Sequence, residues 1–248
     1  MLKFDSIQFD YEPYPIGIIK PALDAAYYQE LVRTFPAIEF FKYMRSKGEK
    51  YSLSQYNEQR NYYSFLRRTP AWKRFHSYIH SPTFITDTYD MLRGHNLDLN
   101  LPGPGFMERM SQRFVAWRKD RPIPHFPRAK ARFEFSAMPI TGGSILPHTD
   151  ATRKSVTMVI PILEEGEWDS AWGGGTCIVR PNDRTRIFNR INAFMDFDEV
   201  EIVKTFPFEP NQCLVFVRTD TSWHAVMPMI GNDKTIFRKT VTINIETS

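Results

Sequence analysis

The second half of the chain is a series of short apolar, β-branched runs separated by turns, and this pattern constrains the fold most. The longest runs are residues 155–163 and 235–245, and the Gly-Asn-Asp-Lys sequence at 231–234 is typical of a turn before the last run. Further runs lie at 132–138, 176–179, 201–206, 213–217 and 223–229. Many short strands with such turns predict an antiparallel sandwich or jelly roll.

The first half carries helix signals instead. Residues 22–35 follow Pro21 and place an apolar side chain at every fourth position. Thr69-Pro70 and Ser81-Pro82 are typical helix starts, and the second of these helices is expected to end near residue 94. We therefore expect a mostly β fold with N-terminal helices. Residues 1–128 form a helical region that packs on a β core at 129–248, and the two make one integrated domain.

Composition excludes several classes of protein. Hydrophobic residues make up 42% and aromatic residues 15% of the chain, which is enough for a packed core. No apolar run reaches membrane-spanning length, and the first residues lack the apolar stretch of a secretory signal. Cys177 and Cys213 are expected to be buried thiols rather than a disulfide. These features predict a soluble, cytoplasmic protein with no membrane partner.

The charge is mildly basic but unevenly distributed. A net charge of +4 does not by itself indicate a nucleic-acid partner. Basic residues nevertheless gather between positions 109 and 132, either as a solvated helix face and loop or as a contact for an anionic substrate. They are Arg109, Arg113, Arg118, Lys119, Arg121, Arg128, Lys130 and Arg132.

Three residues have the chemistry of a metal site. His148 and Asp150 are two positions apart, so in an extended backbone both side chains lie on one face. In a jelly roll His224, from a distant strand, could meet them, although a lone histidine is more often an ordinary core residue. Two histidines and one carboxylate leave coordination positions open, which suits a non-haem Fe(II) that also binds a cosubstrate and oxygen.

A cationic position follows in the last strand. Arg238 and Thr240 are two residues apart and should share a face. A guanidinium and a hydroxyl pointing into a barrel suit a carboxylate ligand, and an arginine within an apolar strand needs a buried anion. Arg132, Glu134 and Ser136 also share one strand face, which makes them candidates for contacts with a substrate.

On these residues the chain resembles the Fe(II)- and 2-oxoglutarate-dependent dioxygenases. His148, Asp150 and His224 match the iron ligands of that superfamily, and Arg238 with Thr240 matches the pair that binds the distal carboxylate of 2-oxoglutarate. PHTDATRKSVTMVIPIL and WGGGTCIVRP look like segments of its prolyl-hydroxylase-like branch, and YPIGIIKPALDAAYYQELVRTFP is similar to an N-terminal leader found in many members. The match covers residues 130–245 and, loosely, that leader.

The resemblance implies a double-stranded β-helix, that is, a distorted jelly roll, with Fe(II), 2-oxoglutarate and O2 as cofactor and cosubstrates. The implied reaction hydroxylates a C–H bond of a small molecule, an amino acid or peptide, or a glycan, and converts 2-oxoglutarate to succinate. Arg238 comes fourteen positions after His224, a longer gap than many members have, so Lys234 and Lys239 are weaker alternatives to Arg238. Asn244 stands where nucleic-acid dealkylases of the superfamily carry a second arginine, which argues against that branch.

Two other functions stay open: a jelly roll that binds a metal or ligand without turnover, and a cupin-like dioxygenase that does not use 2-oxoglutarate. Several further positions favour ordinary structural roles. They are the helical pair His76 and His80, the loop residue His125, the tryptophans Trp172 and Trp223, the glycines at 173–175, and the tyrosines Tyr51, Tyr56, Tyr62 and Tyr63, which either form a lid or pack on the barrel.

Overall fold

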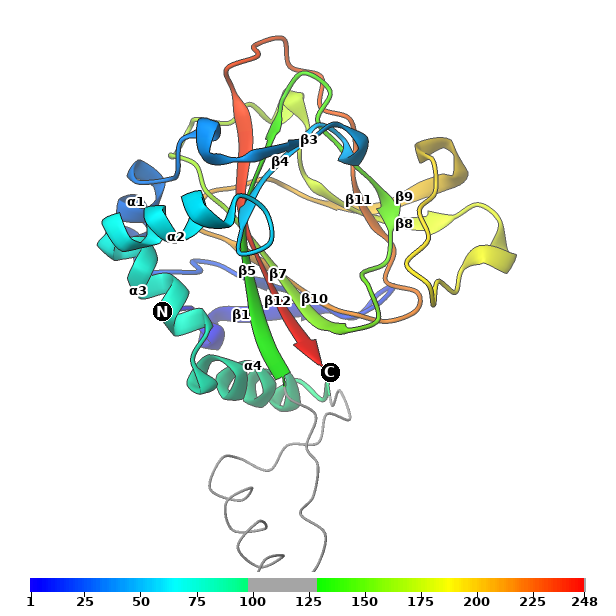
Figure 1. Ribbon diagram of the computed structural model, residues 1–248. Coiled ribbons are helices and arrows are strands. Elements are labelled where there is room, and N and C mark those ends of the chain that lie inside the picture. Colours follow the sequence, from blue (N-terminus) through cyan, green and yellow to red (C-terminus); the bar gives the residue numbers. More distant parts are fainter. Residues whose placement is uncertain (98–128, 248) are drawn as a thin grey trace, which may run out of the picture.

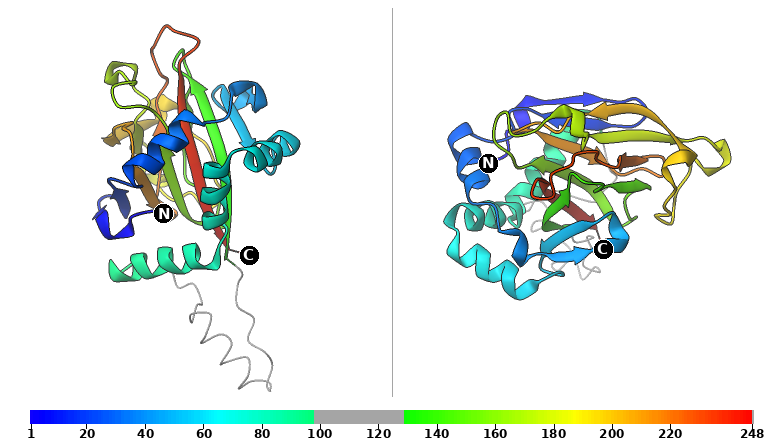
Figure 2. Two further views of the ribbon diagram at one scale, coloured as in Figure 1. Left: turned by 90° about the vertical axis from the view of Figure 1, so that its left-hand side faces the viewer. Right: turned by 90° about the horizontal axis from the view of Figure 1, so that it is seen from above.

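Two antiparallel sheets face each other, and helices from the N-terminal half of the chain cover the outer face of the larger sheet (Figure 1, Figure 2). The computed structural model describes residues 1–97 and 129–247. The arrangement is the predicted double-stranded β-helix, mostly β with N-terminal helices. No helix within the described residues is long and apolar enough to span a membrane.

The larger sheet combines strands from both ends of the chain. Its order is β1 (Ile7–Asp10), β2 (Ile16–Ile19), β10 (Cys213–Val217), β7 (Lys154–Pro161), β12 (Phe237–Thr247), β5 (Ala129–Pro139), β4 (Lys50–Ser54) and β3 (Lys42–Met44). The smaller sheet has the order β6 (Ile145–His148), β11 (His224–Val226), β8 (Thr176–Pro181) and β9 (Val200–Phe206). Strands from before residue 55 therefore flank the strands of the second half.

The α-helices of the described residues are α1 (Ala25–Arg33), α2 (Gln59–Arg68), α3 (Pro70–Ile79) and α4 (Pro82–Gly94), and all of them come before β5 in the chain. Asp24 caps α1 by accepting hydrogen bonds from two backbone amides, and Ser81 caps α4 by accepting one from the backbone amide of Phe84. Trp72 and Phe75 of α3 are fully buried and contact Phe133 and Phe135 of β5 edge-on. These aromatic contacts hold α3 on the sheet.

Alternation along β5 and β12 separates an apolar face from a polar face. Phe133, Phe135, Val241 and Ile243 belong to the helix-facing core, together with Ala131, Ala137 and Ile245. The residues between them point to the inner face, toward the smaller sheet. On β5 they are Arg132, Glu134, Ser136 and Met138, and on β12 they are Arg238, Thr240, Thr242 and Asn244. The candidate site residues of both strands thus share the inner face.

The predicted strands of the second half are confirmed, with shifts of a few residues at their ends, and so are the helices that begin near residues 22, 70 and 82. The sequence did not reveal β1 to β4 or helix α2. These N-terminal strands are short, and all four lie at or beside an edge of the larger sheet, so their alternation is weak. The proposed boundary near residue 128 stays a prediction.

Candidate metal centre

His148, Asp150 and His224 converge as the sequence predicts. His148 ends β6, His224 begins β11, and the two residues are direct neighbours in the antiparallel register of these strands. One ligand atom from each of the three side chains lies within 4.8 Å of the others. Within residues 1–97 and 129–247 this is the only group of three or more His, Cys, Asp or Glu side chains with such geometry.

Both histidines present the same nitrogen to the centre. The Nδ1 atom of His148 lies 2.8 Å from the carbonyl oxygen of Leu146, and that of His224 lies 3.0 Å from the carbonyl oxygen of Ser222. A carbonyl only accepts, so each Nδ1 carries the proton and each Nε2 keeps a free lone pair. This second hydrogen bond is the usual way in which proteins orient a metal-binding imidazole.

The Asp150 carboxylate is held from two sides. Lys154 donates to Oδ1 at 2.6 Å, and the Thr157 hydroxyl donates to Oδ2 at 2.6 Å. The Thr157 oxygen in turn accepts from Asn244 Nδ2 at 2.8 Å, because Thr157 and Asn244 face each other across β7 and β12. Two central strands of the larger sheet therefore fix the orientation of this carboxylate.

The charge states also suit a metal. Burial alone would raise the pKa of Asp150, but the Lys154 ammonium and the two imidazoles outweigh it and hold that pKa below its usual range. Burial, reinforced by the neighbouring His224, lowers the pKa of His148 to about 3. At neutral pH the centre therefore offers an anionic carboxylate and a neutral His148 imidazole, as a divalent cation requires.

Aromatic side chains border the two imidazoles. Phe216 stacks on His224 with ring centroids 4.8 Å apart, and Phe194 stacks on His148 at 5.3 Å. Phe216 is buried, whereas 55% of Phe194 is exposed, so the solvent side of the centre is the side of Phe194. Nothing in the sequence singled out Phe194, Phe216, Lys154 or Thr157, because only the folded register brings them to the three ligands.

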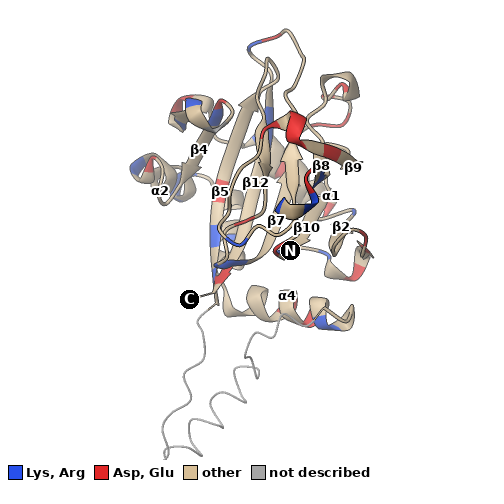
Figure 3. Ribbon diagram, turned by 90° about the vertical axis from the view of Figure 1, so that its right-hand side faces the viewer, with Lys and Arg blue, Asp and Glu red and all other residues tan. Residues whose placement is uncertain are grey.

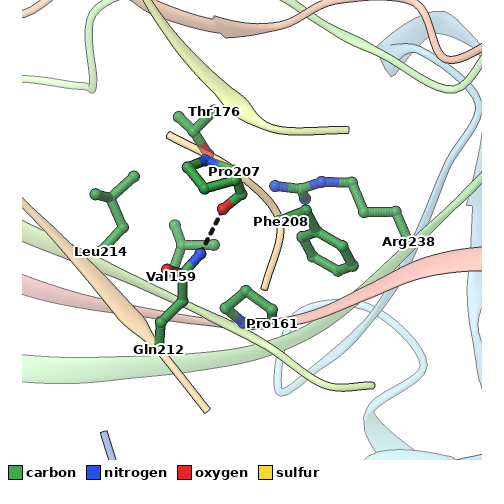
Figure 4. Close-up of a pocket in the computed structure, with 8 residues that line it drawn as sticks. All are labelled: Val159, Pro161, Thr176, Pro207, Phe208, Gln212, Leu214 and Arg238. Atoms are coloured by element: carbon green, nitrogen blue, oxygen red, sulfur yellow. Dashed lines mark hydrogen bonds between the residues drawn. The ribbon is translucent and has the colours of Figure 1, made fainter. Parts of the chain in front are cut away.

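Arg238 lines a small pocket on the same inner face (Figure 4). The residue is 4% exposed, its Nε donates to the carbonyl oxygen of Gly174, and its guanidinium lies 4.7 Å from the ring centroid of Phe208. Burial lowers the pKa of Arg238 to about 10, so the side chain stays cationic at neutral pH. The other residues that line this pocket are Val159, Pro161, Thr176, Pro207, Gln212 and Leu214.

No carboxylate of the described residues forms an ion pair with Arg238. Thr240 is buried on the same face of β12, but the hydroxyl that lines the pocket belongs to Thr176 of β8. Lys239 points to the other side and pairs with Glu167, and Lys234 is exposed. Of the three cationic candidates, Arg238 alone lines this pocket.

The structure also places the candidate substrate residues. Arg132, Glu134 and Ser136 lie on the inner face of β5, opposite Asn244, Thr242 and Thr240 of β12. Glu134 is 8% exposed and pairs with Arg132 and Lys50. Burial alone would raise the pKa of Glu134, but the two cations and the Ser52 hydroxyl lower it to about 2.

The remaining candidates serve the fold or lie elsewhere. His76 of α3 and His80, the residue directly after this helix, stack with ring centroids 4.0 Å apart, and His80 Nδ1 contacts the carbonyl oxygen of His76. Gly173 and Gly174 have positive φ angles of 80° and 79°, which fits a turn. Tyr62 is buried against β5, whereas 57% of Tyr56 is exposed. His125 and the basic positions between 109 and 128 lie outside the described residues.

Comparison with known proteins gives similar structures but no related sequence. No family model matches the chain, and no curated protein does. A prolyl hydroxylase from Trichoplax adhaerens, solved with a hypoxia inducible factor peptide, is 13% identical with a TM-score of 0.49 over 93% of this chain and 83% of that one. A prolyl-4-hydroxylase from Pseudomonas putida is 13% identical with a TM-score of 0.48 over 91% and 89%.

A 2OG-Fe(II) oxygenase family oxidoreductase from Burkholderia pseudomallei is 15% identical, with a TM-score of 0.31 over 54% of this chain and 51% of that one. Likenesses at this level do not carry a function from one protein to another, since one fold hosts many activities. The function of this chain therefore has to follow from its own side chains.

Proposed function

We propose that this protein is an Fe(II)- and 2-oxoglutarate-dependent oxygenase that hydroxylates a C–H bond of its substrate. The observation that carries the proposal is the convergence of two Nε2 atoms and one carboxylate, with a buried arginine in a pocket on the same inner face. A metal site alone would not need that arginine, and an arginine alone would not need the metal site.

The donor set fits Fe(II) in particular. Two imidazoles and one carboxylate, contributed by a strand end, the loop after it and a neighbouring strand, occupy one side of an ion and leave the other side open. When bound there, Fe(II) with 2-oxoglutarate and O2 would supply the oxidising power, with succinate and carbon dioxide as the coproducts. The chain itself has to hold the ligands, seat the keto acid and keep bulk water away.

Arg238 is the residue that we assign to the distal carboxylate of 2-oxoglutarate. A guanidinium binds a carboxylate through two parallel hydrogen bonds, and the pocket around it adds the Thr176 hydroxyl and the Gln212 amide. Phe208 packs on the guanidinium and limits its hydration. Thr240, on the same face of β12, is a supporting position that we place beside this pocket.

The spacing of the two sites suits a five-carbon dicarboxylate. On β7, Thr157 supports Asp150 and Pro161 lines the arginine pocket, four residues further along. Four residues of an extended strand span about 13 Å. A 2-oxoglutarate molecule with a metal at one end and a guanidinium at the other has this length, and the half-buried Val159 lies between the two ends.

The first test separates metal binding from keto-acid binding. Isothermal titration with Mn(II), which supports no turnover, followed by 2-oxoglutarate should show that the keto acid binds tightly only after the metal. His148→Ala should abolish the first step, and Arg238→Ala should weaken only the second, by about 10- to 100-fold. Lys239→Ala is the matched control because Lys239 lies on the same strand but pairs with Glu167 on the other face.

The same titration decides between the proposal and its two rivals. An unchanged 2-oxoglutarate affinity in Arg238→Ala would leave a cupin-like dioxygenase that does not use this keto acid. Normal binding of metal and keto acid without any succinate, across a library of small molecules, amino acids, peptides and glycans, would leave a binding protein without turnover. Substrate-stimulated succinate formation would establish the oxygenase.

A further inference from the structure

We propose that Arg132 and Lys50 form a second anion-binding subsite, which recognises an oxyanionic group of the primary substrate. As a statement about the substrate it rests on the proposed oxygenase function, whereas the binding of an anion to these side chains does not. The subsite lies on β5 and β4, on the same inner face as the candidate metal centre and Arg238.

The register connects this subsite to the metal centre. Arg132 stands opposite Asn244, which donates to Thr157, which in turn donates to the Asp150 carboxylate. Neighbouring strands are about 5 Å apart, so the Cα atom of Arg132 lies about 10 Å from that of Thr157, with β12 between them. A small substrate held at Arg132 therefore comes within reach of the metal.

The charges of the cluster do not balance. The Glu134 carboxylate accepts from Arg132 Nη2 at 3.0 Å, from Lys50 Nζ at 2.7 Å and from the Ser52 hydroxyl at 3.0 Å. Among the described residues two cations thus share one anion, and Figure 3 shows basic and acidic positions along β5. The three side chains are only 11–22% exposed, so solvent screens the surplus positive charge poorly.

Arg132 also has an unused donor. Its Nε is buried and makes no hydrogen bond to any of the residues that the structure describes. A buried guanidinium normally uses its donors, and an oxyanion would satisfy both this nitrogen and the surplus charge. The Tyr56 ring lies 4.8 Å from the guanidinium carbon and is more than half exposed, so an anion would approach alongside this ring.

An alternative role for both cations is to hold Glu134 in place and nothing more. In that case Glu134 would be the reason for the cluster, and added anions would not bind. In our proposal Glu134 is the positioning residue, because its carboxylate holds the two cations together and leaves one positive charge for the substrate.

The experiment observes the unpaired Nε–H group of Arg132 directly. Protein loaded with Mg(II) and 2-oxoglutarate, so that Arg238 is occupied, is titrated with sodium acetate and separately with inorganic phosphate at constant ionic strength. The signal is the arginine Nε–H resonance of Arg132 in nitrogen-15 spectra, assigned by its disappearance in Arg132→Gln. Lys50→Gln tests the second cation, and Lys239→Gln removes the same charge from the opposite face.

We expect a saturable shift of the Arg132 resonance, retained in Lys239→Gln and weakened about 10-fold or more in Lys50→Gln. A substrate screen for succinate should likewise favour acids over their matched amides, and Arg132→Gln should raise KM for the acid far more than it lowers kcat. The proposal is overturned if neither anion shifts the resonance in a saturable way, or if Lys50→Gln leaves the affinity unchanged.

The titration distinguishes this outcome from a failure of the oxygenase proposal. Metal and 2-oxoglutarate affinities are measured on the same samples, and the Arg132 resonance is assigned separately from that of Arg238. If Arg132→Gln folds poorly, Arg132→Lys keeps the charge but lacks the Nε donor, and its KM for the acid substrate should still be higher than that of the parent protein.

Discussion

Thr157 links the candidate metal ligand Asp150 to the larger sheet, and its hydroxyl allows a sharp test of the site. Thr157→Val keeps the shape of the side chain but removes the donor to Asp150 Oδ2 and the acceptor for Asn244. A hydrogen bond to a charged group contributes about 1.5–3 kcal/mol, and a buried amide without an acceptor costs about 1–3 kcal/mol. We expect the free energy of unfolding to fall by about 3 kcal/mol in total.

The same change should weaken metal binding. Among the described residues Lys154 would be the only side-chain donor left to this carboxylate. The carboxylate is then free to turn, and losing the support of a metal ligand typically costs 10- to 100-fold in affinity. Mn(II) titration calorimetry and urea unfolding measure the two effects separately. Thr157→Ser is the matched control, because it keeps the hydroxyl and should retain most of the metal affinity. Equal Mn(II) affinity in Thr157→Val and the parent protein would show that the sheet does not orient Asp150.

Three further predictions follow from other contacts. The folded pKa of Glu134 is about 2, below its unfolded value of 4.5, so the stability that the ionised carboxylate contributes is present above pH 4.5 and is lost as the pH falls toward 2. Urea unfolding across this pH range should show a loss of about 3 kcal/mol in the free energy of unfolding, and Glu134→Gln should not show this loss. Gly174→Ala should destabilise the fold by about 1–2 kcal/mol and weaken 2-oxoglutarate binding, because φ is +79° and the new Cβ would lie 2.7 Å from the Trp168 ring. Urea unfolding measures the loss of stability, and titration calorimetry measures the loss of 2-oxoglutarate affinity. Mn(II) at 100 times its dissociation constant should add about 2.7 kcal/mol to the free energy of unfolding, and His148→Ala should abolish this gain.

The residues of the metal centre could be predicted because their signal is local. His148 and Asp150 are two positions apart, at the end of β6 and in the loop directly after it, so a short stretch of chain brings both side chains to one side. His224 could be added because strand-rich halves of this kind form jelly rolls, which bring distant strands together. Arg238 stood out because it interrupts an apolar strand, where a cation needs a specific reason to be buried.

The supporting residues could not be predicted because their signal is distributed. Thr157 is an ordinary β-branched residue in an apolar run, and only the pairing of β7 with β12 brings Asn244 to it. Thr176 reaches the arginine pocket from the smaller sheet, which no spacing in the sequence indicates. Phe194 lies in an irregular segment, and its contact with His148 depends on how that segment folds back onto β6.

The two arginines of the inner face differ in whether the sequence alone identifies them as ligand-binding residues. Arg238 has no carboxylate partner in the described part of the chain, so its unpaired charge already points to a ligand from outside. Arg132 has Glu134 two residues away, and by sequence alone this pair is neutral and complete. Lys50 changes the balance, and it comes from more than 80 residues earlier, on a strand that the sequence did not reveal. The surplus charge therefore exists only in the folded protein, and so does the inference that this face binds a second anion.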